Sequence, residues 1–171
     1  MKKIFLFISL IFFSFQNLYA DNVYYLDFKL ILNESTAGKK AQDFLKNKLE
    51  SGIKSIKNKE KKIQDEEKEI IQQKKILSPE NYKEKVSKLR AKVSSLQKER
   101  NSLLETISKQ RAKARNELLR NLNPIIKEYM NEKKIRMVIN KKSLLLADEN
   151  LDITKEILNR LNKKLKSINL N

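Results

Sequence analysis

Apolar residues recur at every seventh position in two stretches of the chain, one before and one after Ser78-Pro79. The first ladder of apolar positions comprises Leu49, Ile56, Ile63, Ile70 and Leu77. The second comprises Tyr82, Leu89, Leu96 and Leu103, is interleaved with Val86, Val93 and Ile107, and is broken at its next step by the polar Gln110. Alternating spacings of three and four residues are typical of a helix seam that packs against one partner helix. The pattern therefore predicts one antiparallel helical hairpin, with arms of roughly 40 residues or about 60 Å each.

The position of the turn fixes how the two arms pair. If the numbers of facing residues sum to about 159, the apolar pairs are Leu77–Tyr82, Ile70–Leu89, Ile63–Leu96 and Ile56–Leu103. The layers between them are small or half polar, because Gly52 then faces Ile107 and Lys59 faces Arg100. Two cations in one layer must extend into solvent or find glutamate partners. We therefore predict that Gly52, Lys59 and Arg100 form the hinge at which the arms bend most.

The segments around the ladders predict where the helices begin and end. Residues 23–28 are rich in aromatic and apolar residues and predict a short strand, and residues 29–33 a helical turn. A long helix is expected over 36–77, with several capping residues at 33–36. Pro79 fits the first turn of a second helix that runs to about residue 133. Pro124 lies inside that helix and is expected to kink or interrupt it.

After the hairpin, the spacing of apolar residues changes from a helical to a strand pattern and then back to a helical pattern. Residues 135–139 and 143–147 predict two strands joined by a turn at 140–142, and a last helix is expected over about 153–166, capped by Asp148 or Asp152. The fold class is therefore α+β and mostly α, with a long antiparallel coiled-coil hairpin (36–133, tip near 78–80) projecting from a small β-strand body (21–35 and 134–171). A hairpin this thin and a sheet this small bury too little apolar area to be stable alone. We expect the body to form oligomers through its strand residues Val23, Tyr25, Leu26, Asp27, Ile135, Met137, Ile139, Leu144 and Leu146.

The first 20 residues have the pattern of a secretory signal peptide. Lys2 and Lys3 precede an almost wholly apolar run over residues 4–15, which is too short to span a bilayer comfortably. The sequence Leu18-Tyr19-Ala20 suggests cleavage after about Ala20. Leu18 is larger than the residue preferred there, so an uncleaved anchor is the alternative. The chain is therefore expected to be exported.

Composition excludes several function classes and favours anionic partners. The chain has no cysteine, histidine or tryptophan, so the commonest general base, the commonest metal ligand and the best nucleophile are missing. We expect no catalytic residue, no metal site and no enzyme activity. Lys plus Arg number 38 against 21 acidic residues, and the imbalance persists once residues 1–20 are removed. Such a charge attracts anionic partners over long distances.

Basic residues gather near the predicted tip. We predict that these cations, together with the apolar Ile76, bind clients or an anionic surface; the alternative is an ordinary solvated helix face. The residues are Lys74, Lys75, Ile76, Lys83, Lys85, Lys88, Arg90 and Lys92.

The two ends of the mature chain resemble the OmpH/Skp family of periplasmic chaperones. The resemblance rests on YLDF at 25–28, NES at 33–35 and GKK at 38–40, and on LLLAD at 144–148 followed by LDITKEIL at 151–158. It implies a homotrimer in which strands from three chains form a small barrel and three helical tentacles enclose a cavity. It also implies an ATP-independent holdase, without a cofactor, that keeps unfolded outer-membrane proteins from aggregating in the periplasm before membrane insertion. The lipopolysaccharide site proposed for the family has no distinct counterpart among these basic residues.

Two other classes of function compete with this interpretation. An exported coiled-coil scaffold would explain the arms, and a basic envelope protein that binds anionic lipid or a lipopolysaccharide-like surface would explain the charge. A nucleic-acid binder is disfavoured by the signal peptide and by the scarcity of aromatic and arginine residues, so we expect no nucleic-acid partner.

Overall fold

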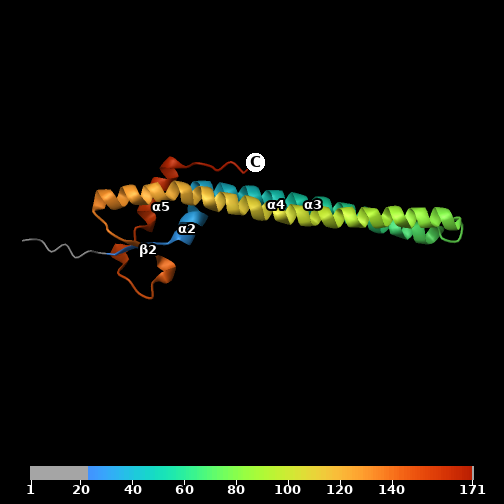
Figure 1. The fold of residues 1–171 in the computed structure, drawn as a ribbon, viewed down its shortest axis with the longest axis horizontal. Coiled ribbons are helices and arrows are strands. Elements are labelled where there is room, and N and C mark those ends of the chain that lie inside the picture. The colour runs from blue at the N-terminus through green and yellow to red at the C-terminus, as the bar shows by residue number, and fades with distance from the viewer. Residues whose placement is uncertain (1–22, 171) are drawn as a thin grey trace, which may run out of the picture.

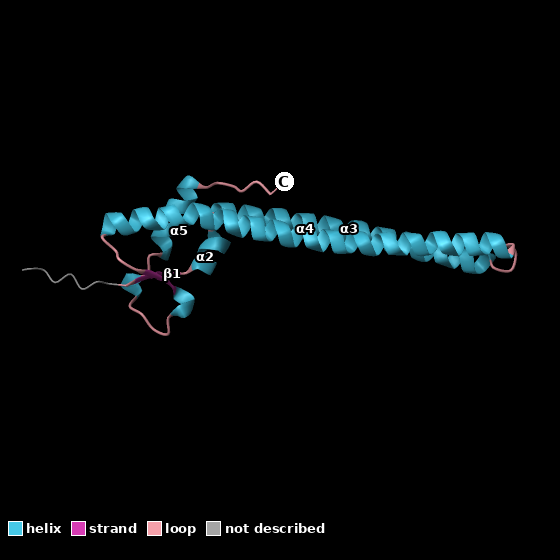
Figure 2. Cartoon of the chain, in the orientation of Figure 1, coloured by secondary structure: helices cyan, strands magenta, loops and turns pink. Residues whose placement is uncertain are grey.

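Two long antiparallel helices dominate the computed structural model, which describes residues 23–170 (Figure 1). Helices α3 (Thr36–Gln73) and α4 (Pro79–Lys133) lie side by side, with the turn that joins them at one end and the body at the other. The predicted signal peptide lies outside the described residues. The body elements, visible in Figure 2, are β1 (Tyr24–Leu26), α2 (Phe28–Glu34), β2 (Val138–Asn140), the 3-10 turns η1 (Lys141–Ser143) and η2 (Glu149–Leu151), and α5 (Thr154–Lys164). None of the helices between residues 23 and 170 combines the length and apolar character needed to cross a membrane.

Serine side chains cap both long helices. Ser35 Oγ accepts a hydrogen bond from the backbone N–H of Gly38 at 3.1 Å, and Ser78 Oγ accepts one from Asn81 at 3.3 Å. Helix α3 ends at Gln73, four residues earlier than predicted, because the chain uses residues 74–77 to reverse direction before Pro79. Helix α4 begins and ends where the sequence predicts.

Helix α4 continues through Pro124 without a break, so an interruption at this residue is wrong, whereas a kink there stays a prediction. A proline inside a helix removes one hydrogen bond and crowds the preceding turn. On either side of it, however, Leu122 and Ile125 are almost completely buried in the body. We attribute the continuity of α4 to this packing.

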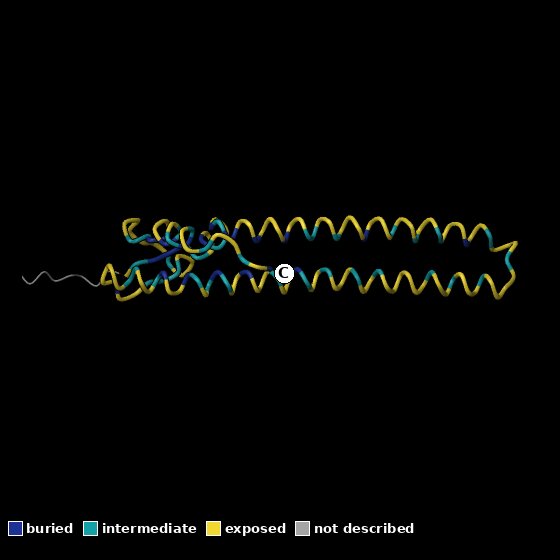
Figure 3. The backbone as a smooth tube through the Cα atoms, turned by 90° about the horizontal axis from the view of Figure 1, so that it is seen from above, coloured by how far each residue is buried: buried dark blue, intermediate teal, exposed yellow. Residues whose placement is uncertain are grey.

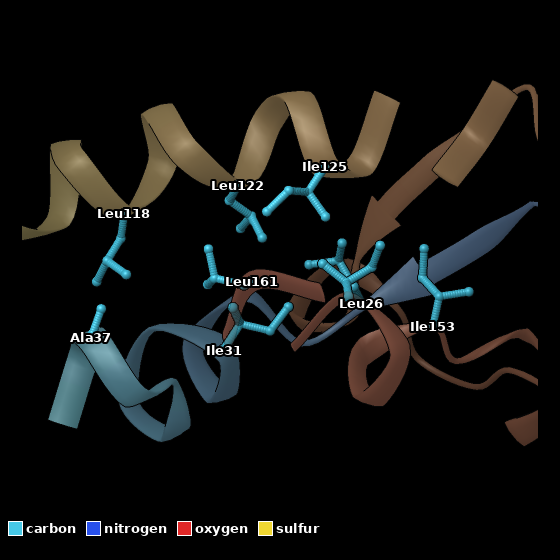
Figure 4. Packing of buried hydrophobic residues seen from close by; sticks show 9 residues of the cluster. Leu26, Ile31, Ala37, Leu118, Leu122, Ile125, Ile153 and Leu161 are labelled. Carbon is cyan, nitrogen blue, oxygen red and sulfur yellow. The ribbon is translucent and has the colours of Figure 1, made fainter. Parts of the chain in front are cut away.

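The main hydrophobic core lies at the base of the hairpin. Figure 4 shows Leu118, Leu122 and Ile125 of α4 facing residues of α2 and α5, among them Ile31 and Leu161. Figure 3 shows the contrast with the arms, where exposed residues predominate toward the tip and buried residues concentrate at the base. The body therefore anchors the hairpin, and the distal arms depend on their own seam.

Strands β1 and β2 pair in parallel, with Tyr25 opposite Ile139. Strand β1 is shorter than predicted because Asp27 Oδ1 caps α2 by accepting a hydrogen bond from Leu30 N at 2.9 Å, so Phe28 is already helical. Strand β2 begins at Val138 rather than residue 135, because the backbone N–H of Ile135 still bonds to Met130 O at the end of α4.

The strand predicted over residues 143–147 is wrong. The Asn140 side chain accepts a hydrogen bond from Lys142 N at 3.1 Å and starts the turn η1. Leu144 and Leu146 follow in irregular backbone, and Leu145 and Leu146 are fully exposed. Within the described residues, no strand lies beside this segment, so its backbone has no ladder to join.

The arms pair in the predicted register. Ile56 and Leu103 line one small cavity between the helices, and Ile63 and Leu96 line another. In the layer with two cations, Lys59 bonds to Glu99 on the opposite arm at 2.6 Å, and Arg100 bonds to Glu60. Of the two alternatives for this layer, the structure therefore shows glutamate partners. Bending at this layer stays a prediction.

Candidate functional site

The tip of the hairpin is a short turn that presents one apolar side chain. The backbone N–H groups of Ile76 and Leu77 both bond to Gln73 O at 3.0 Å, which closes the end of α3. Leu77 turns partly inward, whereas Ile76 is 83% exposed. Ile76 is therefore accessible at the tip, and its contact with a client stays a prediction.

Four of the seven predicted tip cations already interact with residues of the same chain. Lys92 pairs with Glu66 at 2.6 Å and Lys88 with Glu84 at 2.6 Å. Lys85 Nζ donates to Gln73 Oε1 across the arms at 2.6 Å. Lys74 Nζ lies 5.9 Å from the centre of the Tyr82 ring, within cation–π range.

The Glu84–Lys88 pair shifts the titration of both groups. The hydrogen bond from Lys88 and its charge lower the pKa of the Glu84 carboxyl, and the same contacts raise the pKa of Lys88. Both side chains therefore stay charged across the neutral range, and the Lys88 charge is largely balanced by its neighbour.

The other three tip cations are exposed and form no ion pair within residues 23–170. These are Lys75, Lys83 and Arg90. The structure thus divides the predicted group into cations that stabilise the hairpin and cations that are available to a partner. We call Lys75, Lys83 and Arg90 the open cations.

The predicted oligomerisation residues divide in a similar way. Tyr25, Leu26 and Ile135 are buried within the chain, and Leu26 belongs to the main core. Asp27, Ile139 and Leu144 are partly buried, whereas Val23, Met137 and Leu146 are exposed. A partner subunit could therefore reach the last group without any rearrangement of the body.

An open hollow of about 450 Å³ lies against β2. It is lined mostly by apolar residues, among them Phe28 of α2, Met130 of α4 and Met137 just before β2, together with the polar Arg136 and Asn140. The hollow borders the exposed Met137, and the fully exposed Leu145 and Leu146 follow η1 soon after β2. Apolar surface is thus concentrated around one small two-stranded sheet.

Sequence reasoning missed a side-chain clamp that joins α5 to the end of α4. Arg160 donates to both Glu132 carboxylate oxygens, at 2.8 and 2.7 Å, and to Glu156 at 2.9 Å. Its guanidinium lies 4.8 Å from the centre of the Tyr129 ring. The hydrogen bonds to the two carboxylates raise the pKa of Arg160, so the clamp is charged at every physiological pH. Spacing along one helix could suggest Glu156–Arg160, but nothing local predicts Glu132.

The sequence also gave no sign of how residues 165–170 are placed. This segment, which we call the strap, leaves α5 and runs back along the base of the hairpin (Figure 1). Leu170 is buried among Ala41, Leu45, Ile107 and Ala114, and Gln110 Nε2 donates to Leu170 O at 2.6 Å. The residue that breaks the second ladder thus holds the strap. The sequence predicted a helix over 153–166 and made no prediction for the residues after it.

Residues 23–170 contain no cluster of three or more acidic residues that could hold a metal ion. The family model described as "Outer membrane protein (OmpH-like)" matches residues 22–161. No curated protein matches the chain. The fold is similar to a crystal structure of a candidate outer membrane chaperone (OmpH-like) from Caulobacter crescentus, with a TM-score of 0.81 and 18% identity over 86% of this chain and 87% of that one. The chain belongs to the OmpH-like family.

Proposed function

We propose that the protein is an ATP-independent holdase chaperone of the periplasm. It is exported with removal of residues 1–20, binds unfolded outer-membrane proteins and prevents their aggregation before membrane insertion. The observation that carries this proposal is the paired arm of α3 and α4, which extends far beyond its core in a member of the OmpH-like family. At 1.5 Å per residue, the 38 residues of α3 span about 57 Å.

The surface of the arm suits weak and reversible binding of many clients. Most of its residues are exposed, and the seam alternates apolar layers with polar layers closed by cross-arm ion pairs. An unfolded membrane-barrel strand alternates apolar and polar side chains, so scattered contacts retain it without fixing one structure. Several arms acting together would bind tightly even if each contact is weak.

Assembly of the body into a homotrimer would bring several arms together, and two features of the body support such an assembly. A two-stranded sheet is marginal on its own, and β1 and β2 form such a sheet within the described residues. Exposed apolar residues flank these strands in the sequence: Val23 directly precedes β1, Met137 directly precedes β2, and Leu145 and Leu146 follow η1. Burial of these side chains against equivalent residues of other copies would stabilise both the sheet and the assembly.

Anionic lipid or lipopolysaccharide-like surfaces are a second candidate partner of the tip. The open cations Lys75, Lys83 and Arg90 favour such a partner, because they are exposed and none of them forms an ion pair within residues 23–170. This role is compatible with client binding and does not require it.

Dilution of a urea-unfolded outer-membrane barrel into the purified mature protein tests the proposal. We expect light scattering to stay low, and native mass spectrometry to report three chains with one client. The variant Leu145→Ser/Leu146→Ser should remain folded but lose the trimer, because both side chains are exposed in the single chain. Scattering equal to that of the client alone, from a folded wild-type protein, would exclude the holdase.

A further inference from the structure

The end of the strap, residues 168–170, alternates apolar and polar residues as a client strand does; its start does not, because Lys166 and Ser167 are both polar and Lys166 lies in a bend. Its last described residues alternate in exposure: Ile168 is partly buried, Asn169 is exposed and Leu170 is 4% exposed. The backbone leaves α5 in an extended conformation at Leu165, with φ −124° and ψ 111°. An extended segment with alternating apolar and polar residues is the form that a strand of a membrane barrel takes.

The surface under the strap is a groove between the two arms at the base of the hairpin. We call it the strap groove; it is formed by Lys40, Ala41 and Phe44 of α3 and by Ile107, Gln110 and Ala114 of α4. Figures 1 and 3 both place the end of the chain along this part of the hairpin. Leu170 enters the apolar floor, and Ile168 packs against both this cluster and the main core.

The strap does not fill the groove completely. A cavity of about 230 Å³ remains between Ile168, Leu170 and the α3 side of the groove, beside the partly exposed Phe44. A larger apolar side chain than those of the strap could therefore enter the same place.

The Gln110 side chain uses only one of its two kinds of hydrogen-bonding group on the strap. A glutamine amide can donate to a carbonyl and accept from an N–H at the same time. Here Nε2 donates to Leu170 O at 2.6 Å, but Oε1 is buried and has no hydrogen-bond partner among residues 23–170. A buried acceptor left unpaired costs free energy, so a peptide that also offers an N–H at this point would gain an interaction the strap lacks.

We propose that the strap groove is a binding site for extended peptide segments that alternate apolar and polar residues, and that the strap occupies it as an intramolecular competitor. The site rests on the proposed chaperone function, for which it supplies one defined contact at the base of each arm. If the strap covers the groove nine-tenths of the time, the apparent affinity for a peptide is about tenfold weaker than that of the open groove.

Peptide binding measured by fluorescence anisotropy tests the proposal. The probes are a labelled peptide of about ten residues that alternates leucine with serine or asparagine, and a peptide of the same composition in scrambled order. Replacement of Leu170 by Ser should free the groove and raise the affinity for the alternating peptide about tenfold. Lys166→Ser is the matched control, because Lys166 is an exposed strap residue, and it should leave the affinity unchanged.

A second pair of variants guards against loss of folding. A chain that ends at Leu165 should bind the alternating peptide at least as well as Leu170→Ser, while far-UV circular dichroism checks that the helices remain. In that shortened chain, Gln110→Leu should weaken peptide binding, although the leucine restores the apolar ladder and should strengthen the hairpin. If Gln110 had only a structural role, the shortened chain with Gln110→Leu would bind the peptide at least as tightly as the shortened chain that keeps Gln110.

The outcomes separate this site from the proposed function. If no folded variant binds the alternating peptide more tightly than the scrambled one, the groove is not such a site, even if the protein still suppresses aggregation of a barrel client. If the shortened chain binds only a peptide with the sequence of residues 165–171, the groove is specific for the strap and the proposal fails. Tight binding of the alternating peptide without suppression of aggregation would support the groove and exclude the holdase.

Discussion

The hydroxyl of Thr154 accepts a hydrogen bond from the backbone N–H of Asp27 at 2.7 Å, although the two residues lie 127 positions apart. The same hydroxyl donates to Asp152 Oδ1, whose carboxylate also accepts from Thr154 N at 2.9 Å. One side chain therefore joins the end of β1 to the start of α5. This connection helps to close the body from two distant parts of the sequence.

Replacement of Thr154 by Val should destabilise the body by about 1–3 kcal/mol, because the N–H of Asp27 would lose its partner in a partly buried position. Thr154→Ser keeps the hydroxyl and should cost clearly less. Urea unfolding followed by circular dichroism measures both variants. Equal losses for Val and Ser would mean that the Thr154 methyl group, not its hydroxyl, matters.

The stability of the body should fall at acid pH through Asp152. Burial raises the pKa of this carboxyl, but hydrogen bonds from Thr154 and Lys141 outweigh that effect and hold the pKa below its ordinary value. A carboxyl with a lowered folded pKa contributes stability that is complete above its unfolded pKa of about 4 and is lost as the pH falls through the folded pKa.

Comparison with Asp152→Asn isolates this contribution. Unfolding free energies measured between about pH 3 and pH 6 should decline less steeply in the variant than in the wild type. Other carboxyls with lowered pKa values, such as Glu84, Glu105 and Glu132, remain in both proteins and cancel in the difference. Parallel curves would show that Asp152 does not change its protonation on unfolding.

Gly38 is required by a close approach of two backbones. A Cβ atom at this position would lie 1.9 Å from the carbonyl oxygen of Leu32 and 2.8 Å from Ser35 Oγ. Because the first contact is backbone, it cannot be relieved by a side-chain rotation. Gly38→Ala should therefore separate α2 from α3 and cost about 2 kcal/mol or more, as overpacked sites do. Thermal unfolding measures the loss, and an unchanged Tm would contradict it.

The regular part of the fold follows from local pattern, and the body does not. The seven-residue spacing and the Ser78-Pro79 turn predict α4 and the register of the arms, because coiled-coil packing depends on sequence period. The strand expected at residues 143–147 fails because strand formation needs a neighbour, which the Leu145-Leu146 segment lacks in a single described chain.

The candidate site was predictable to a similar degree. The cations near the tip are visible in the sequence, but their division is not, since Lys92 is balanced by Glu66, 26 residues away. The strap was missed because one buried and one partly buried apolar residue in an irregular segment carry no periodic signal. Gln110 was noticed as a break in the second ladder, but only the structure gives it a partner in Leu170.

Replacement of Gly52 tests whether the two arms can accommodate an additional side chain between them. A Cβ at this position would lie 2.5 Å from Leu103 Cδ2, the end of a flexible side chain. Alanine gains about 1 kcal/mol of helix propensity over glycine, but displacement of Leu103 costs about 1–3 kcal/mol. Gly52→Ala alone should therefore be neutral or destabilising.

A double-mutant cycle separates the two effects. In a Leu103→Ala background the obstacle is gone, so Gly52→Ala should then stabilise the protein by about 1 kcal/mol. Urea unfolding measures all four proteins. If Gly52→Ala raised the unfolding free energy in the wild-type background, Leu103 would be able to move aside freely. The predicted hinge at Gly52 would then depend only on the backbone flexibility of glycine.

The open cations should carry the salt-sensitive part of binding at the tip. Replacement of Lys75, Lys83 and Arg90 by Ala leaves the ion pairs of the hairpin intact, so the fold should not change. Affinity for vesicles that contain anionic lipid, or for an acidic unfolded client, should fall at low salt and lose most of its dependence on ionic strength. Cosedimentation over a range of salt concentrations measures both quantities.

The matched control removes three cations that the chain already engages, Lys85, Lys88 and Lys92. It lowers the net charge by the same amount, but it also exposes acidic partners such as Glu66 and Glu84. If binding followed net charge alone, the two triple variants would lose equal affinity and equal salt dependence, since long-range attraction depends on total charge. A contact made by side chains at the tip instead predicts that the open-cation variant loses more. Equal losses would therefore reject a local tip site.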